Sequence, residues 1–249
     1  MKRLLFITVL FITFFLNSQV QPSTKYAQTI TDKELKELLY VYASDYFAGR
    51  EAGTRGQKIA VDFLKDYYIN LGINSAKGTN PSYFQSMKLI IDRKVVATEN
   101  VAAIITGSEK PNEYIIITSH LDHIGTHDGE INNGADDDGS GTVAMLEIAQ
   151  AFKQASKKGK GPKRSIIFLH VTGEEKGLLG SAYYADNPIY PLANTVTNLN
   201  LDMIGRIDPT RKGDKREYIY IIGSDHDSQD LHTLSEQTNL ETVNIDLDY

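Results

Sequence analysis

The chain has 249 residues and no cysteine. This absence excludes disulfide bonds, thiolate metal ligands and lipid attachment to a cysteine side chain. Long hydrophobic runs are also scarce: the run Leu4–Leu16 has 13 residues, whereas a membrane-spanning helix needs about 20. We therefore expect stability to come from an ordinary packed core or from bound metal ions.

The N-terminal segment has the pattern of a signal peptide. Lys2 and Arg3 precede the apolar run Leu4–Leu16, and polar residues follow it. Residues 1–20 are therefore predicted to be a signal peptide that directs export to the periplasm or the extracellular medium. Residues 21–249 suit a single α/β domain, because one hydrophobic core usually stops growing near this length.

Negative charge is in excess. The formal net charge is −6, and removal of Lys2 and Arg3 with a signal peptide would change it to −8. An acidic surface repels nucleic acid and anionic membranes. We expect no nucleic-acid partner and no stable membrane insertion after signal removal.

Two amphipathic helices are predicted at the start of the mature chain. Thr31 and Glu34 have the spacing of a capping box, and apolar residues at helical spacing follow them. The glycine-containing segment Gly49–Gln57 interrupts this pattern. A second apolar stripe then begins at Ala60, and Gly72 is expected to end that helix.

From residue 100 onward, short apolar runs alternate with helical patterns. The runs are rich in β-branched residues and nearly continuous, as in strands that are buried on both faces. Five strands are expected, at 100–107, 114–120, 164–171, 195–203 and 218–223, with helices at 142–152 and 228–239. The alternation predicts an α/β fold, a three-layer α/β/α sandwich around a mixed, mostly parallel sheet.

Polar residues follow the predicted strands. His120 ends one strand, Glu174 and Glu175 follow another, and Asp202 ends a third, while Asp137 lies in a glycine-rich loop before a helix. In such sheets the ligand site lies beyond the carboxyl ends of the strands. Each residue alone has a plain structural explanation, such as a helix cap or a solvated loop acid. Their shared place at one edge favours a functional site.

Converging carboxylates would repel one another without a positive partner, and a metal ion is the obvious one. Imidazole and carboxylate ligands without thiolate suit Zn²⁺, with Mn²⁺ or Co²⁺ as substitutes, and make an all-oxygen Ca²⁺ site less suitable. The side chains of consecutive residues diverge, so Glu174 and Glu175 cannot easily share one role. One of them can bind metal while the other accepts a proton from water.

These residues resemble the co-catalytic two-zinc aminopeptidases of metallopeptidase clan MH, family M28. The matching segments extend over nearly all of the mature chain and read ASDYFAGREAGTRGQ, SHLDHIG, NNGADDDGSGTVAMLEIAQAF, VTGEEKGLLGSAYY and NLNLDMIGR. The resemblance implies a zinc-peptidase fold and a zinc-dependent aminopeptidase that acts on peptides with a free N-terminus.

The resemblance also implies a role for each site residue. Asp137 would bridge two zinc ions, with His120 and Asp202 completing one side and Glu175 the other. Glu174 would be the general base, taking a proton from a water that bridges the metals. Asp122 resembles an acid that orients the ligand imidazole.

Neighbouring residues receive other interpretations. Asp136 and Asp138 are expected to cap or to form hydrogen bonds. The glycines at 134, 139 and 141 let the backbone pass close to the bridging carboxylate. The family pattern gives His123 and His127 no ligand role, and His170, inside an apolar strand, is expected to be buried and neutral.

One expected ligand is missing. In the family, the second zinc also takes a histidine from an S-D-H sequence near the end of the domain. Ser224-Asp225-His226 has these letters but follows its strand too early, so His226 is a weak candidate. The expectation is that residues 21–249 lack the C-terminal part of the catalytic domain, bind the second zinc weakly and have little activity. Two tight zinc sites would instead point to His226 or another histidine.

Two other functions remain open. A glutaminyl cyclase-like acyltransferase has a similar fold with a single zinc, and a non-catalytic ectodomain could keep the fold only to bind partners. The GADDDGSG and GEE sequences favour two metals and hydrolysis. Carboxypeptidase action on acidic dipeptides also stays open, as does the preferred N-terminal residue.

Overall fold

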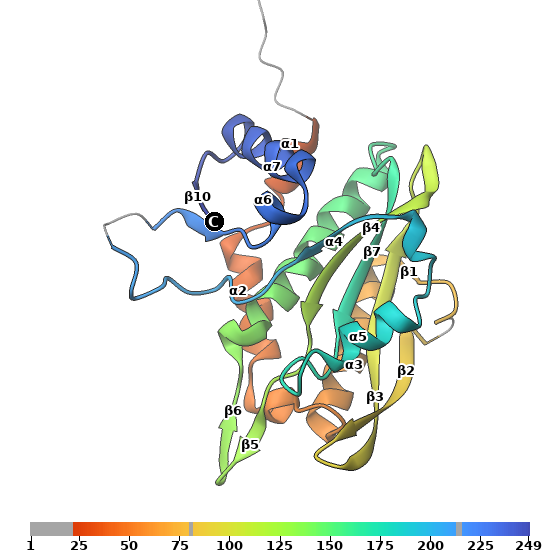
Figure 1. The fold of residues 1–249 in the computed structure, drawn as a ribbon, viewed down its shortest axis with the longest axis vertical. Coiled ribbons are helices and arrows are strands. Elements are labelled where there is room, and N and C mark those ends of the chain that lie inside the picture. The colour runs from red at the N-terminus through yellow and green to blue at the C-terminus, as the bar shows by residue number, and fades with distance from the viewer. Residues whose placement is uncertain (1–21, 80–81, 213–215) are drawn as a thin grey trace, which may run out of the picture.

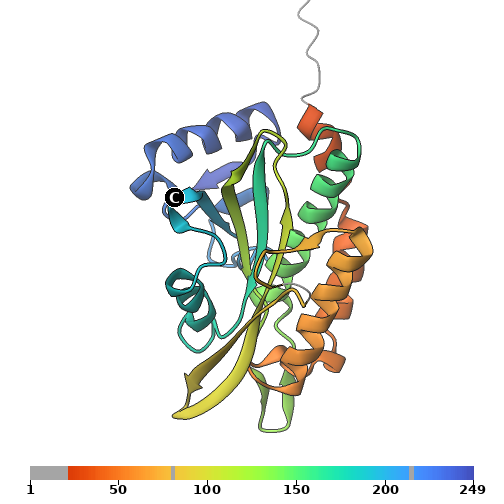
Figure 2. The same cartoon turned by 90° about the vertical axis from the view of Figure 1, so that its right-hand side faces the viewer.

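A mixed β-sheet lies between two layers of helices in the computed structural model, which describes residues 22–79, 82–212 and 216–249. Figure 2 shows the sheet with the orange and green helices on one side and the teal helix α5, Leu179–Asp186, on the other. The predicted three-layer α/β fold is confirmed. The predicted signal peptide at 1–20 lies outside the described residues.

The main sheet has six strands in the order β1-β3-β7-β4-β8, with β2 paired to β3. Their bounds are β1 Asn74–Ser75, β2 Phe84–Ile91, β3 Lys94–Ile105, β4 Lys110–His120, β7 Arg164–Val171 and β8 Thr195–Asn200. β4 is parallel to both β7 and β8, whereas β3 is antiparallel to β7, β1 and β2. The parallel half of the sheet therefore consists of the three strands that precede the candidate site residues.

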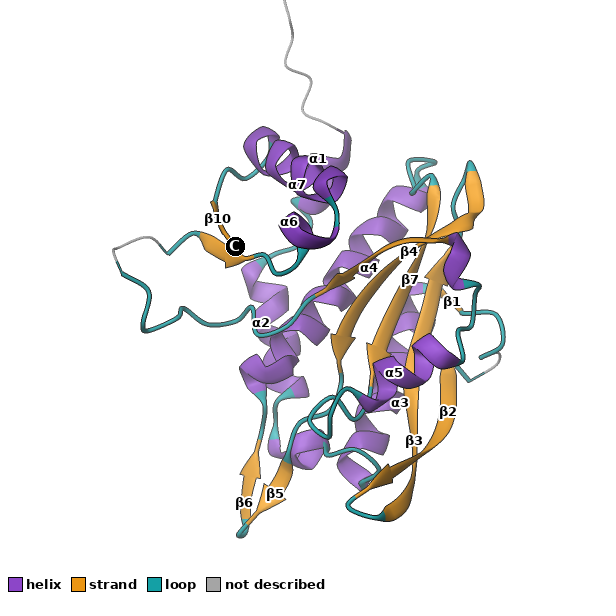
Figure 3. Cartoon of the chain, viewed as in Figure 1, coloured by secondary structure: helices purple, strands orange, loops and turns teal. Residues whose placement is uncertain are grey.

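The predicted helices are present with shifted bounds, and two further helices, α1 and α5, were not predicted. Their bounds are α1 Pro22–Ala27, α2 Asp32–Tyr42, α3 Arg55–Leu71, α4 Gly141–Lys157, α5 Leu179–Asp186, α6 Ser224–Asp227 and α7 Gln229–Glu241, with shorter turns η1 Asp45–Arg50, η2 Ala135–Ser140 and η3 Leu192–Asn194. The Thr31 hydroxyl accepts a hydrogen bond from the Glu34 amide at 3.2 Å, as the capping box predicts. Gly72 ends α3 in the left-handed conformation. Figure 3 shows these helices beside the strands.

The sequence of β7 is apolar at successive positions because both faces of this strand are buried. Ile166 and Phe168 face the core beneath α3 and α4, whereas Ile167 and Leu169 face the core beneath α5. A strand that is buried on both faces needs apolar side chains at successive positions.

The predictions for the C-terminal strands are partly wrong. The segment 218–223 was expected to be a buried strand, but β9 covers only Tyr218–Tyr220 and pairs with β10, Asp246–Asp248, in a separate two-stranded sheet. Ile222 is 94% exposed. β8 is an edge strand, and Val196 and Leu199 on it are exposed. Among the described helices, none is both long and apolar enough to cross a membrane.

Candidate metal centre

The candidate residues meet at the carboxyl ends of the parallel strands. β4 ends at His120, Glu174 and Glu175 follow β7, and Asp202 follows β8. Asp137 lies in η2, which leads into α4. The hairpin of β5, Gly125–His127, and β6, Glu130–Asn132, extends from the same end of the molecule (Figure 1). These residues therefore lie at one edge of the sheet, as predicted.

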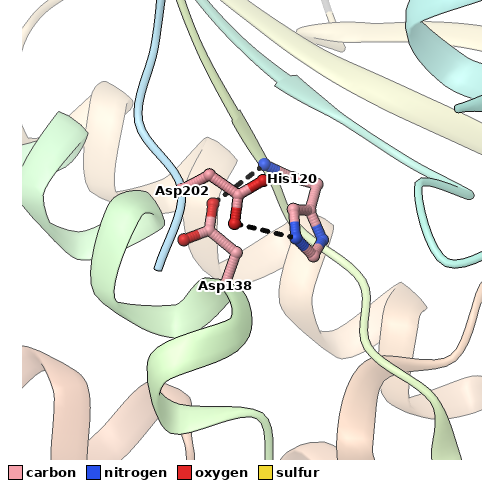
Figure 4. Close-up of side chains that lie close together, drawn as sticks. All are labelled: His120, Asp138 and Asp202. Carbon is pink, nitrogen blue, oxygen red and sulfur yellow. Dashed lines mark hydrogen bonds and ion pairs between the residues drawn. The ribbon is translucent and has the colours of Figure 1, made fainter. Parts of the chain in front are cut away.

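The first cluster surrounds the imidazole of His120, which is 2% exposed. Its Nε2 atom lies 3.0 Å from Asp137 Oδ1 and 3.7 Å from Asp202 Oδ1. Figure 4 shows the Asp202 carboxylate beside the His120 ring, with a dashed line joining the two. Nε2 is buried, and none of these contacts has the alignment of a hydrogen bond. When the ring is neutral with its proton on Nδ1, the Nε2 lone pair is available to a cation.

The second cluster contains the other oxygen of Asp137. His123 Nδ1 lies 2.7 Å from Glu175 Oε1 and 3.9 Å from Asp137 Oδ2. The candidate ligand atoms of these three residues lie within 4.8 Å of one another. Asp137 therefore lies between two groups, with one carboxylate oxygen toward each. The family pattern gave His123 no ligand role, but the structure brings it into this group.

Asp138 holds the strand ends and the helix together. Its carboxylate accepts hydrogen bonds from the backbone amides of His120 at 3.1 Å, Gly141 at 2.9 Å and Met203 at 3.3 Å (Figure 4 shows the first). The expected hydrogen-bonding role is thus observed, although Asp138 also lies within ligand distance of His120 and Asp202. Burial raises the pKa of Asp138 to about 8, against the opposing effect of His120.

Asp122 connects the first cluster to the loop that carries the two glutamates. His120 Nδ1 donates to the backbone carbonyl of Asp122 at 3.1 Å, while the Asp122 carboxylate is farther away, at 3.9 Å. That carboxylate instead accepts from the Glu174 amide at 3.2 Å. A donating Nδ1 leaves Nε2 as the atom that faces a metal. The orienting acceptor is therefore the Asp122 main chain, and its carboxylate positions Glu174.

The titration of His120 reflects the surrounding acids. Burial alone would lower the pKa of His120, but Asp202, Asp138 and Asp122 outweigh it and raise the pKa to about 9. Burial raises the pKa of the Asp122 carboxyl to about 6, with His120 opposing. Without metal, the imidazole therefore carries the positive charge that the acids require.

Glu174 is half-buried and belongs to neither cluster, whereas Glu175 belongs to the second. Burial raises the pKa of Glu174, and the negative charges of Glu175, Asp202 and Asp137 raise it further, while His120 lowers it. A raised carboxyl pKa brings the group closer to the range in which it both accepts and donates a proton. The adjacent glutamates thus have different environments.

The remaining candidate histidines lie away from the clusters. His127 donates from Nε2 to the Ile124 carbonyl at 2.7 Å. The side chain of His226 is 89% exposed and pairs with Asp227 at 2.8 Å. The structure therefore does not bring His226 into either candidate group. His170 is fully buried, as predicted, between the hydroxyls of Tyr68 and Ser119.

Acid is expected to destabilise the fold through His170. Burial lowers the pKa of His170 to about 3 from 6.5, so between these values the unfolded chain binds a proton that the folded chain does not. The stabilisation is complete above pH 6.5 and falls by about 1.4 kcal/mol per pH unit below it. Urea unfolding between pH 6.5 and 5, with chelator present, should show a shallower pH slope for His170→Gln. Equal slopes would contradict a neutral buried imidazole.

Two cavities differ in their distance from the candidate site. One of about 450 Å³ adjoins the first cluster through Asp202 and is lined mainly by apolar residues of the loop after β8 and of β9. A larger one, of about 700 Å³, is lined by α1, by the end of α4 and by loops that contain no candidate site residue. Only the smaller of the two is placed to receive part of a substrate.

Comparison with known proteins identifies the family. The model of peptidase family M28 matches residues 100–242. A probable zinc metalloprotease of Pyrenophora teres f. teres is 39% identical over 164 residues, which are 62% of this chain and 32% of that protein. The probable glutamate carboxypeptidase LAMP1 of Arabidopsis thaliana is 33% identical over 118 residues, 47% of this chain and 16% of that protein. Aminopeptidase NAALADL1 of Rattus norvegicus is 37% identical over 108 residues, 43% of this chain and 14% of that protein.

Solved structures share the fold. LapB of Legionella pneumophila aligns with a TM-score of 0.67 and 24% identity, covering 96% of this chain and 59% of that chain. Glutaminyl cyclase of Porphyromonas gingivalis aligns with a TM-score of 0.64 and 19% identity, covering 85% and 74%. This chain spans about a third or less of the length of the curated relatives named above. By the match of the family model to more than half of its length, the chain belongs to peptidase family M28.

Proposed function

We propose that this chain carries the catalytic centre of a zinc-dependent exopeptidase that removes N-terminal residues from peptides. The observation that carries the proposal is the position of Asp137, whose two carboxylate oxygens face two groups that each contain an imidazole and a further carboxylate. Glu174 belongs to neither group, and residues of both groups act electrostatically on its carboxyl. This arrangement supports two metal ions with a separate proton acceptor.

The residues fit zinc. His120 Nε2, His123 Nδ1 and Glu175 Oε1 are buried, and their close contacts, 3.0 Å from His120 to Asp137 and 2.7 Å from His123 to Glu175, lack the alignment of hydrogen bonds. A cation would satisfy all three atoms. Imidazole nitrogens and carboxylate oxygens are ligands that zinc accepts. His120, Asp137 and Asp202 would hold one ion, and Asp137 with Glu175 the other. Zinc bound there supplies Lewis-acid chemistry, polarising the substrate carbonyl and acidifying water.

The protein groups supply positioning and proton transfer. The hydrogen bond from the Glu174 amide to Asp122 fixes the position of the base. Glu174 takes the proton of the attacking water and returns it to the departing amine, and its raised pKa suits both steps.

Three rival functions stay open. A glutaminyl cyclase shares the fold, relatives include glutamate carboxypeptidases, and a non-catalytic domain would keep the fold alone. Two metal groups with an uncommitted glutamate favour hydrolysis over single-zinc cyclisation. The aminopeptidase among the relatives favours action at the N-terminus. Export, inferred from residues 1–20, remains part of the proposal.

Removal and return of zinc tests the proposal. Chelation is expected to abolish release of the N-terminal residue from a short peptide, and zinc should restore it, whereas N-acetylation of the same peptide should block release. Zinc at 1,000 times its Kd should raise the free energy of unfolding by about 4 kcal/mol for one site. Mass spectrometry identifies the product. Cyclisation of an N-terminal glutamine, release of a C-terminal glutamate, or zinc binding without turnover would each favour the corresponding rival.

A further inference from the structure

The loop after β7 carries Glu174 and Glu175, and its next residue, Lys176, contacts the segment before α3. Lys176 Nζ lies 2.9 Å from Oε1 of Glu51. We propose that Lys176 and Glu51 form a positioning pair, which holds this loop so that Glu174 faces the water that it deprotonates. The inference rests on the proposed function and deepens it by naming what orients the general base.

The two ends of this loop are fixed by one buried side chain. Asn100 of β3 accepts a hydrogen bond from the Thr172 amide at 3.0 Å and donates one to the Gly180 carbonyl at 3.0 Å. The Gly180 amide also donates to the Thr172 carbonyl at 2.8 Å. Asn100 has no exposed surface. The loop is therefore closed at its base, and what remains to be set is the direction of its tip, residues 174–178.

Hydrogen bonds within the tip do not set that direction. The amides of Gly177 and Leu178 donate to the Glu174 carbonyl at 2.8 and 2.9 Å, so these bonds move with the tip. The Glu174 amide donates to the Asp122 carboxylate at 3.2 Å, but the tip can turn about one such contact. Because the side chains of consecutive residues diverge, Lys176 anchors the tip on a different side from its neighbour in the metal group. The ion pair with Glu51 therefore adds a separate point of attachment.

Glu51 is a fixed partner for this attachment. It follows the fully buried Arg50, and its carbonyl accepts hydrogen bonds from the amide of Thr54 at 3.0 Å and from its hydroxyl at 2.6 Å. Gly125 of β5 has a φ of +80°, and a Cβ atom on it would lie 2.8 Å from Glu51 Oε2. The glycine therefore leaves the space that the carboxylate occupies, and the other oxygen of that carboxylate contacts Lys176.

The pair differs from the ion pairs on the open surface. The side chains of Glu51 and Lys176 are 27% and 20% exposed, whereas those of Glu109 and Lys163 are 58% and 73% exposed. Water and salt screen an exposed pair, so that it contributes little, and they screen a partly buried pair less. Lys163 directly precedes β7 and lies at the end of the strand opposite the candidate site. Its pair is therefore a matched control.

Turnover at saturating zinc tests the role of the pair. Lys176→Met is expected to lower kcat by about 10- to 100-fold with KM unchanged, because a misplacement of about 1 Å in a catalytic site costs up to about 100-fold. Lys176→Arg keeps the positive charge and should recover most of the loss. Lys163→Met should leave kcat unchanged. Unchanged kcat in Lys176→Met would overturn the proposal.

Glu51→Gln separates positioning from the effect of a charge acting through space. A positioning role requires that Glu51→Gln and Lys176→Met both lower kcat and that the combined variant is no worse than either. Loss of a negative and of a positive charge would instead shift the acid limb of the pH profile in opposite directions. In the Glu174→Gln background, Lys176→Met should cause no further loss. Opposite effects of the two single variants, or an undiminished loss without Glu174, would overturn the proposal.

Amide exchange with deuterium tests the pair without turnover. In the metal-free and the zinc-loaded chain, the amides of the tip should exchange faster in Lys176→Met and in Glu51→Gln, and at the unsubstituted rate in Lys163→Met. Equal rates in all four proteins would overturn the positioning role even where peptidase activity is present. Absence of zinc-dependent hydrolysis by the unsubstituted chain would instead refute the proposed function, and with it the role of the pair in orienting a base.

Discussion

Replacement of Glu174 by glutamine is expected to lower turnover by a factor of about 10² to 10⁴ while zinc content stays unchanged. The magnitude is that of a positioned general acid–base group. Glutamine keeps the size and shape of the side chain but cannot accept the proton. The hydrogen bond to Asp122 comes from the backbone amide of residue 174, so the loop should keep its conformation.

Glu175→Gln is the matched comparison for this prediction. Glu175 belongs to the second metal group and lies against His123, so its amide variant should lose metal before it loses proton transfer. The measurements are turnover on an unblocked peptide and zinc per chain for both variants. Equal loss of zinc in the two variants would contradict the division of roles between the adjacent glutamates.

Removal of the Arg50 guanidinium is expected to cost about 3–5 kcal/mol of the free energy of unfolding. Arg50 is fully buried and donates to four carbonyls, those of Tyr42, Leu121, Asn133 and Gly134, at 2.7–3.1 Å. Each carbonyl would be left without this donor. Burial lowers the pKa of Arg50, and Tyr42 and the acids of the metal centre oppose that effect. The variant therefore loses both hydrogen bonds and a counter-charge.

Urea unfolding of Arg50→Met and Arg50→Lys measures this loss. Lysine keeps the charge but not the planar fork, so it should recover little of the stability. Arg55→Met is the control, because Arg55 is exposed at the start of α3 and its replacement should stay within about 0.5 kcal/mol. A loss below about 1 kcal/mol in both Arg50 variants would show that the carbonyls find other partners.

The parts of the fold that could be predicted are those with strong local signals. The continuous apolar runs gave the buried strands β4 and β7, and Thr31 and Gly72 gave helix boundaries. The hairpin of β2 and β3 was missed for a physical reason: Asp92 and Arg93 form its two-residue turn with φ values of 49° and 63°. Such turns usually contain asparagine and glycine, which the sequence lacks there.

The candidate site shows the same division. The positions of His120, Glu175 and Asp202 after predicted strands indicated that they lie close together, because parallel strands bring their carboxyl ends to one edge. Nothing in the spacing of His120 and His123 tells where the ring of His123 points after the strand ends. Its place depends on Gly134, where a Cβ atom would lie 2.5 Å from Cγ of the ring. The burial of Arg50 likewise could not be predicted, because its acceptors lie at Tyr42, at Leu121 and at residues 133–134, which come together only in the folded chain.

The contacts of Arg50 bear on the order of events during folding. Its partners are 8, 71, 83 and 84 residues away along the chain, so three distant segments must converge before the guanidinium finds its acceptors. The strands of the sheet pair over similar separations, such as Tyr114 with Thr195, so sequence separation alone does not order the two events. The guanidinium needs its acceptor carbonyls in place, and two of them lie in the loop before η2. If these bonds form only after the sheet, removal of the guanidinium will speed unfolding more than it slows folding.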